Sequence, residues 1–129
     1  MSTDLIMLAW SSALCVVLFL PYVLARTMVW GLADTVGYPK NPPTLPDWAD
    51  RAYRAHRNMV ENLAPFAALV LTAQASGRAS TTTALAATLF FWARLAHAIV
   101  FIAGIPWLRT LSFMVGVIAM AMIFLAIIA

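Results

Sequence analysis

Residues 51–66 read RAYRAHRNMVENLAPF and combine charged and amide side chains before the chain continues, without a break, into apolar residues. Four of the polar side chains recur at the spacing i, i+3, i+4 and i+7, which places them on one face of a helix: Arg54, Arg57, Asn58 and Glu61. Ionisable groups at the edge of a membrane-spanning helix are costly and usually face other helices or a polar cavity. We therefore interpret this face as the wall of a binding site.

The composition predicts an integral membrane protein with one domain over residues 1–129. Hydrophobic residues make up 64% of the chain and charged residues 10%, whereas about a quarter of the residues of a soluble protein are charged. Cys15 is the single cysteine, which excludes a disulfide framework or a zinc site built from this chain, and no metal site is predicted. There is no basic run with interleaved aromatic residues, so nucleic acid is not an expected partner.

The hydropathy pattern predicts an all-α fold, an antiparallel bundle of four transmembrane helices. Three apolar segments are long enough to cross ~30 Å of hydrocarbon, and the polar segment quoted above begins the remaining helix. We interpret residues 31–48, which contain four prolines, as an interfacial loop without a helix, because no helix continues through that density of proline. Short links between helices favour an antiparallel bundle. The expected helices cover residues 5–30, 48–75, 81–103 and 106–128.

The distribution of basic residues predicts the orientation in the membrane. Arg78 lies between the second and third helices, while six other basic residues lie at the ends that face the first and third connections: Arg26, Lys40, Arg51, Arg54, Arg57 and Arg109. The positive-inside rule then places both termini outside the cytoplasm and the proline-rich loop in the cytoplasm. Arg94 and His97 lie roughly 10–15 Å from the cytoplasmic end of their helix at 1.5 Å per residue. The polar groups of all four helices therefore converge on the cytoplasmic leaflet.

The converging side chains predict a strongly electropositive site. Five arginines face the single acid Glu61, and arginine pairs with carboxylates through two parallel hydrogen bonds. Such a site suits an anion with several carboxylates. The alternative is an internal network, such as Glu61 with Arg94, that only fastens helices together, but one acid cannot neutralise five arginines. The candidate residues are Arg26, Arg54, Arg57, Asn58, Glu61, Arg94, His97 and Arg109.

At these residues the sequence resembles the MAPEG family, the membrane-associated proteins of eicosanoid and glutathione metabolism, in its short bacterial type. The resemblance covers nearly the whole chain. Its strongest part is ArgAlaHisArgAsn at 54–58 with Glu61 and the Pro65-Phe66 pair, and its second part is ArgLeuAlaHis at 94–97 with Arg109. The resemblance implies a homotrimer of four-helix subunits, in a bacterial inner membrane, with glutathione bound between neighbouring subunits near the cytoplasmic face.

The resemblance also implies roles for single residues. Arg109 corresponds to the arginine that stabilises the glutathione thiolate, and Thr110 keeps the hydroxyl that follows it. A cation beside the sulfur lowers the thiol pKa from ~8.5 towards neutrality, and the thiolate then attacks a lipophilic electrophile or peroxide that enters from the bilayer. Phe101 and Phe113 stand where the eicosanoid-forming members carry tyrosines. The tripeptide's polar groups are expected to be held by Arg54, Arg57, Asn58 and Glu61, with contributions from Arg26, Arg94 and His97.

Three functional hypotheses follow. The first is a glutathione transferase or peroxidase that acts on hydrophobic electrophiles. The second is a non-catalytic member of the same fold, a structural or accessory subunit with a protein partner in a membrane complex. The third, a small multidrug exporter, requires an acidic residue deep in the membrane, whereas Glu61 lies near the interface among arginines. Formation of thiolate when glutathione binds separates the first hypothesis from the second.

Overall fold

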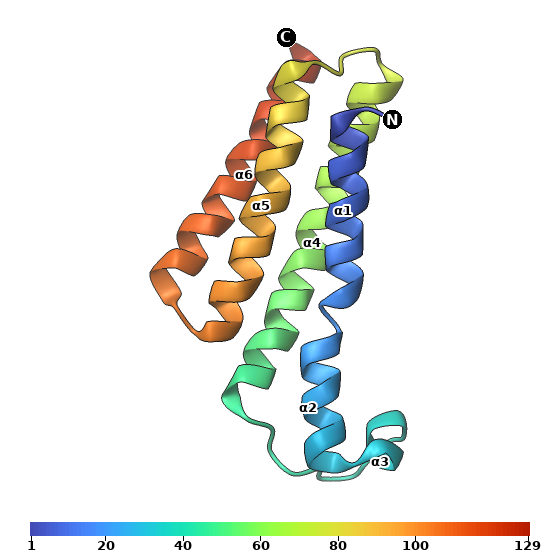
Figure 1. Ribbon diagram of the computed structural model, residues 1–129, viewed down its shortest axis with the longest axis vertical. Helices are drawn as coiled ribbons and strands as arrows, with labels where there is room; N and C mark the ends of the chain where they lie inside the picture. The colour runs from blue at the N-terminus through green and yellow to red at the C-terminus, as the bar shows by residue number, and fades with distance from the viewer.

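A computed structural model describes residues 1–129, and its regular structure is entirely helical, without strands. The all-α prediction is therefore confirmed. The helices form long rods that run side by side, with both termini at one end and the loop between the first and second rods at the other (Figure 1). The helices are α1 (Thr3–Val17), α2 (Leu20–Trp30), α3 (Leu32–Val36), α4 (Asp47–Ala75), α5 (Thr81–Ala103) and α6 (Pro106–Ile128).

The first rod consists of two helices where the sequence predicts one. The break between α1 and α2 falls at Leu18 and Phe19. Pro21 explains it, because proline has no N–H to donate to the carbonyl four residues earlier and is tolerated in the first turn of a helix, where it stands in α2. Leu18 and Phe19 keep right-handed helical backbone angles. The two parts therefore remain one apolar rod from Thr3 to Trp30.

The connection after α2 also differs from the prediction, because it begins with the short helix α3. The first proline of this segment is residue 39, so the argument from proline density applies only beyond α3. Gly31, with φ of +82°, provides the left-handed turn between α2 and α3. The indole Nε1 of Trp30 donates a hydrogen bond of 2.8 Å to the Pro43 carbonyl, and this bond holds the loop against the end of α2.

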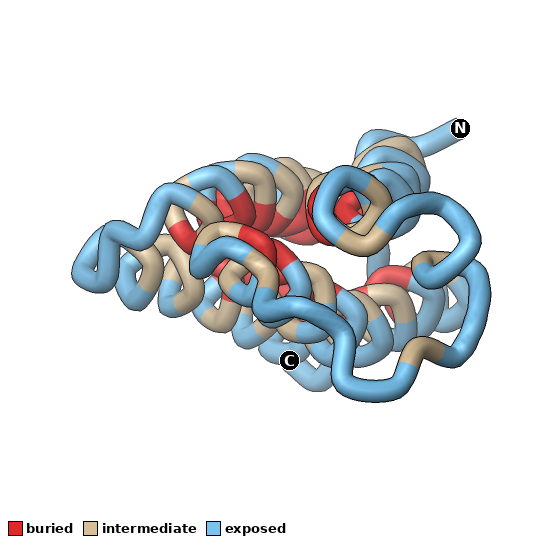
Figure 2. The backbone as a smooth tube through the Cα atoms, turned by 90° about the horizontal axis from the view of Figure 1, so that it is seen from below, coloured by how far each residue is buried: buried red, intermediate tan, exposed pale blue.

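Helix α5 lies at the centre of the bundle and packs against α1, α4 and α6. The closest pair of aromatic rings joins Phe66 of α4 to Phe90 of α5, which stack at 3.8 Å between centroids and are fully buried. Five alanines also belong to this core, and small side chains let helix backbones approach closely. The buried residues turn towards the space between the rods (Figure 2). The alanines of this core are Ala73, Ala86, Ala87, Ala98 and Ala119.

Three helical segments are long and apolar enough to cross a membrane: Thr3–Trp30, Thr81–Ala103 and Pro106–Ile128. Helix α4 has 29 residues, or ~43 Å at 1.5 Å per residue, but its first turns are charged. The charged part of α4 lies at the same end of the bundle as α2 and the α5–α6 turn (Figure 1). The charged first turns of α4 therefore lie at one end of the molecule, which we call the polar end.

An arginine ties the start of α4 to the turn between α5 and α6. The Arg51 Nε donates a hydrogen bond of 2.9 Å to the Ile102 carbonyl. Gly104 ends α5 with φ of +80°, and a Cβ at this position would stand 3.2 Å from the Arg51 guanidinium carbon. Glycine is therefore favoured by the backbone angle, and a Cβ here would require the Arg51 side chain to shift by a few tenths of an ångström.

Gly104→Ala is expected to lower the thermal stability of the protein in detergent. The left-handed backbone costs a residue with a Cβ roughly 1–2 kcal/mol, and displacement of Arg51 weakens a charge-assisted hydrogen bond as well. Gly77→Ala is the matched control, because Gly77 has φ of +69° and open space around it. Circular-dichroism melting should give the larger loss for Gly104→Ala, by about 1 kcal/mol or more. Equal losses would show that the Arg51 contact adds nothing.

Candidate functional site

A pocket of about 420 Å³ opens between α4, α5 and α6 at the polar end of the bundle. It contains seven of the nine site residues proposed from the sequence, together with two phenylalanines. Arg26 and Arg94 are not part of its lining. The lining residues are Arg54, Arg57, Asn58 and Glu61 of α4, His97 and Phe101 of α5, and Arg109, Thr110 and Phe113 of α6.

The pocket follows from helix periodicity and one chain reversal. The α4 residues recur at i, i+3, i+4 and i+7, so a straight helix turns them all to one side. His97 and Phe101 are four residues apart on α5 and share a face in the same way. The turn at Gly104 reverses the chain, and this reversal brings Arg109, near the start of α6, beside the end of α5. The polar faces of α4, α5 and α6 thus meet around one pocket.

Positive charge exceeds negative charge in this pocket. Arg57 pairs with Glu61 and Arg54 with Asp50, each at 4.0 Å and each along one turn of α4. Side chains of both pairs are more than half exposed, and such pairs contribute little to stability. Arg109 has no carboxylate partner in the chain. The pocket can therefore accept a ligand with more than one negative group.

Two of the pocket arginines lie over the ring of Phe101. The guanidinium carbons of Arg109 and Arg54 lie 5.2 Å and 5.7 Å from its centroid, within the range of cation–π attraction. The His97 ring approaches the same phenylalanine edge-on at 5.4 Å. Phe101 therefore supplies an aromatic face to the site, and no hydroxyl.

Arg94 lies behind the pocket wall. Its side chain is 1% exposed, and its Nη2 donates a hydrogen bond of 2.6 Å to the Oδ1 of Asn58. The pairing with Glu61 that was considered as a purely structural alternative is not formed, because Glu61 pairs with Arg57 instead. The sequence indicated that Arg94 belongs with this group of residues, but the structure places it one layer away from the cavity.

Arg26 lies in a second pocket, of about 380 Å³, against α2, α4 and the proline-rich loop. Its guanidinium carbon stands 5.0 Å, 5.6 Å and 5.7 Å from the ring centroids of Tyr22, Trp30 and Tyr53. Its Nε is buried and has no hydrogen-bond partner. Within one chain the structure does not bring Arg26 together with Arg54 and Arg109. Helical spacing could have indicated two of these rings, because Tyr22 and Trp30 stand four residues before and after Arg26 on α2. The third ring, Tyr53, comes from α4 and had no such signal.

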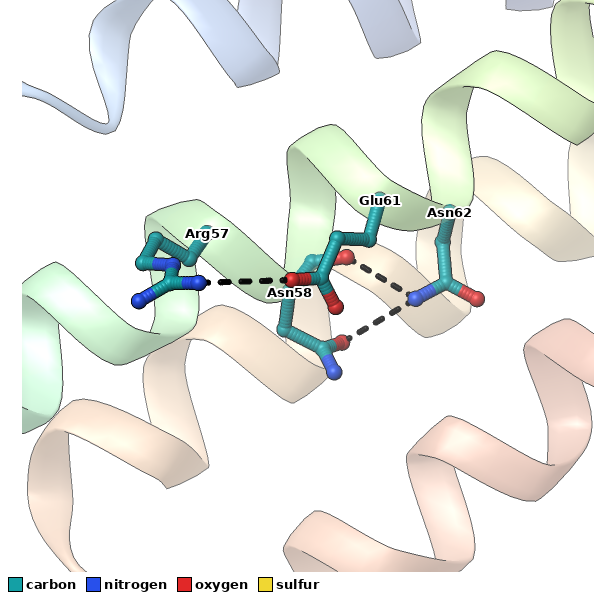
Figure 3. A network of polar contacts seen from close by, with 4 residues as sticks. All are labelled: Arg57, Asn58, Glu61 and Asn62. Carbon is teal, nitrogen blue, oxygen red and sulfur yellow. Dashed lines mark hydrogen bonds and ion pairs between the residues drawn. The ribbon is translucent and has the colours of Figure 1, made fainter.

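Two further sets of polar contacts were missed by the sequence reasoning. The Tyr22 hydroxyl and the His56 Nδ1 share a hydrogen bond of 2.8 Å. On α4, the Asn62 Nδ2 donates to the Asn58 carbonyl at 2.8 Å and to the Asn58 Oδ1 at 3.3 Å, as Figure 3 shows beside the Arg57–Glu61 pair. The i+4 spacing of Asn62 from Asn58 could have revealed the second of these contacts.

The bundle and its pocket define a class: an integral membrane protein of packed helices with an electropositive site at one end. Within that class the chain belongs to the MAPEG family, whose model matches residues 7–129. The resemblance stated from the sequence is therefore confirmed over nearly the whole chain. The family contains glutathione-dependent transferases and peroxidases as well as non-catalytic members. Comparison with curated proteins and with solved structures found no match.

Proposed function

We propose that this protein binds glutathione and uses it, through a thiolate stabilised by Arg109, as a transferase or peroxidase acting on hydrophobic electrophiles. The observation that carries the proposal is the convergence of three arginines, one glutamate and one amide on a single pocket of about 420 Å³. Glutathione offers two carboxylates and one ammonium group. The arginines suit the carboxylates, Glu61 suits the ammonium group, and the family includes glutathione-dependent enzymes.

The proposed chemistry uses the charge of Arg109. Because this guanidinium has no carboxylate partner in the chain, its charge is available to a ligand sulfur and favours the thiolate over the thiol. The Thr110 hydroxyl lines the pocket next to it and donates to the Pro106 carbonyl at 3.2 Å. In a transfer reaction the thiolate forms a C–S bond with the electrophile, and the leaving group departs with its electron pair. The thiol proton passes to water.

The proposal extends to the membrane arrangement and the assembly. We place α4 across the membrane as a fourth span, both termini outside the cytoplasm and the pocket in the cytoplasmic leaflet of a bacterial inner membrane. The termini lie together, at the end opposite to α2 and α3 (Figure 1), as an even number of spans requires. In the homotrimer that we propose, Arg26 of a neighbouring subunit completes the site. A lipophilic substrate reaches the thiolate from the bilayer.

Titration of the purified protein with glutathione in detergent tests this function. The expected result is saturable binding accompanied by thiolate absorbance in the ultraviolet. Arg78→Ala is the control that should bind normally, because Arg78 lies on the α4–α5 loop, where it contacts the Ala129 carbonyl at 3.1 Å. Absence of binding would refute the proposal.

A second candidate function is a non-catalytic accessory subunit of a membrane complex with a protein partner. The observation that favours it is that the aromatic residues of the pocket, Phe101 and Phe113, both lack a hydroxyl. The same titration separates the two functions, since glutathione binding without thiolate favours the accessory subunit over the enzyme.

Phe101→Tyr is expected to tighten glutathione binding about fivefold, the effect of one added hydrogen bond of ~1 kcal/mol. The new hydroxyl would stand in the pocket that Phe101 lines, while the ring would still lie under Arg54 and Arg109. Isothermal titration calorimetry gives the affinity. Phe101→Leu is the matched control, which removes the ring and should weaken binding. A tyrosine variant that binds no better than wild type would place the ligand away from this ring edge.

A further inference from the structure

Arg94 carries a buried charge without a carboxylate partner. It is 1% exposed, it lies in the helix α5 that crosses the centre of the bundle, and it takes part in neither ion pair of the chain. Its Nε has no hydrogen-bond partner. A buried charge is tolerated only where hydrogen bonds compensate for lost water. The short bond from its Nη2 to the Oδ1 of Asn58, 2.6 Å, is the side-chain contact that meets this need.

This contact fixes which way round the Asn58 amide lies. A guanidinium has only donors, so an amide turned by 180° would place its NH₂ group against the N–H of Arg94. Asn62 reinforces the same orientation, because its Nδ2 also donates to the Asn58 Oδ1. Figure 3 shows the oxygen of Asn58 directed at Asn62 and the nitrogen turned away from it. Two donors therefore occupy the oxygen and leave the nitrogen free.

The NH₂ group of the Asn58 amide has no partner in the chain, and Asn58 lines the pocket. Asn58 lines the cavity, whereas Arg94 does not. The Asn58 Nδ2 makes no hydrogen bond within the chain and is not among the buried atoms that lack a partner. Its two N–H donors are thus available to a bound molecule, while Glu61 is the one carboxylate in the lining.

We propose that Arg94 is a positioning residue that acts through Asn58, locking the amide so that the pocket meets N–H donors at this point and prefers a carboxylate or peptide carbonyl there. This inference rests on the proposed function and deepens it. The site then presents hydrogen-bond donors at Asn58 and an acceptor at Glu61, one turn further along α4, so its two ends differ chemically. A ligand with an ammonium group at one end and a carboxylate or carbonyl nearby then fits in one orientation and not in the reverse one.

A double-mutant cycle on glutathione affinity tests the inference. Arg94→Lys keeps the charge but changes the donor geometry, Asn58→Ala removes the amide, and the double variant carries both changes. We expect each single variant to weaken binding about tenfold. In the Asn58→Ala background, Arg94→Lys should change the dissociation constant less than twofold. A second tenfold loss in the double variant would show that Arg94 acts independently of Asn58, and it would overturn the proposal.

A measurement without ligand tests the contact itself. Asn58→Asp gives Arg94 a carboxylate partner, so we expect a higher melting temperature in detergent. With Arg94→Met the same change no longer gains this partner, so the melting temperature should not rise. Equal shifts in the two backgrounds would overturn the proposal. If wild-type protein does not bind glutathione, the proposed function fails, and this thermal cycle alone decides whether Arg94 sets the Asn58 amide.

Discussion

Replacing Arg109 with alanine is expected to slow glutathione conjugation about 100- to 1000-fold, the usual cost of removing one group that stabilises developing or transferred negative charge. Arg54 and Arg57 each have a carboxylate one helical turn away, whereas Arg109 has none. Its guanidinium lies 5.2 Å from the centroid of Phe101, so the cation stands over an apolar face in the pocket. The loss should fall on kcat, because the charge is needed when the thiolate forms and reacts.

The measurement is steady-state conjugation of glutathione to an aryl halide, with kcat and KM determined separately. Arg109→Lys keeps a positive charge and should retain part of the rate. Arg78→Ala, at the other end of the bundle, should leave both constants unchanged. If Arg109→Ala raises KM and leaves kcat intact, Arg109 is a binding residue and the thiolate is stabilised elsewhere.

The part of the site on α4 could be predicted because helix periodicity acts within one element. Arg54, Arg57, Asn58 and Glu61 share a face in any α-helix, and their common pocket follows directly. His97 and Arg109 were also placed at the same end of the bundle, from the expected helix ends and the antiparallel order of the helices. Such arguments use only spacing and hydropathy, both of which are local properties of the chain.

The contacts of Arg94 and Arg26 that cross between helices could not be predicted in this way, although Tyr22 and Trp30 share a helix face with Arg26. Both arginines were expected at the ligand, but the structure packs Arg94 against Asn58 and Arg26 among three aromatic rings. Which side of a helix faces which neighbour depends on side-chain packing between elements, and helical spacing leaves it open. The break before Pro21 is a different case. Its physical reason is local, but the same residues also lie in a stretch of 21 residues without a charge, residues 5–25.

Phe66→Ala is expected to cost about 3–5 kcal/mol of stability, the usual range for removing a buried aromatic ring. Phe66 is fully buried and stacks on Phe90 at 3.8 Å with an angle of 11° between the rings. It directly follows Pro65, which has no N–H for the Glu61 carbonyl within α4. The stacked pair therefore joins α4 to α5 at a point where α4 lacks one of its own hydrogen bonds.

Thermal and denaturant unfolding in detergent measure this loss. Phe66→Leu should cost less than Phe66→Ala, because leucine fills most of the volume. Phe124→Ala is the exposed control, with a ring that is 49% exposed on α6, and it should have little effect. Because Phe66 lies five residues from Glu61, separation of α4 and α5 at the stacked pair also opens the pocket wall. Phe66→Ala should therefore lose glutathione binding at a lower temperature than wild type, in step with its unfolding. Binding that survives beyond the melting transition would show that the pocket does not depend on this contact.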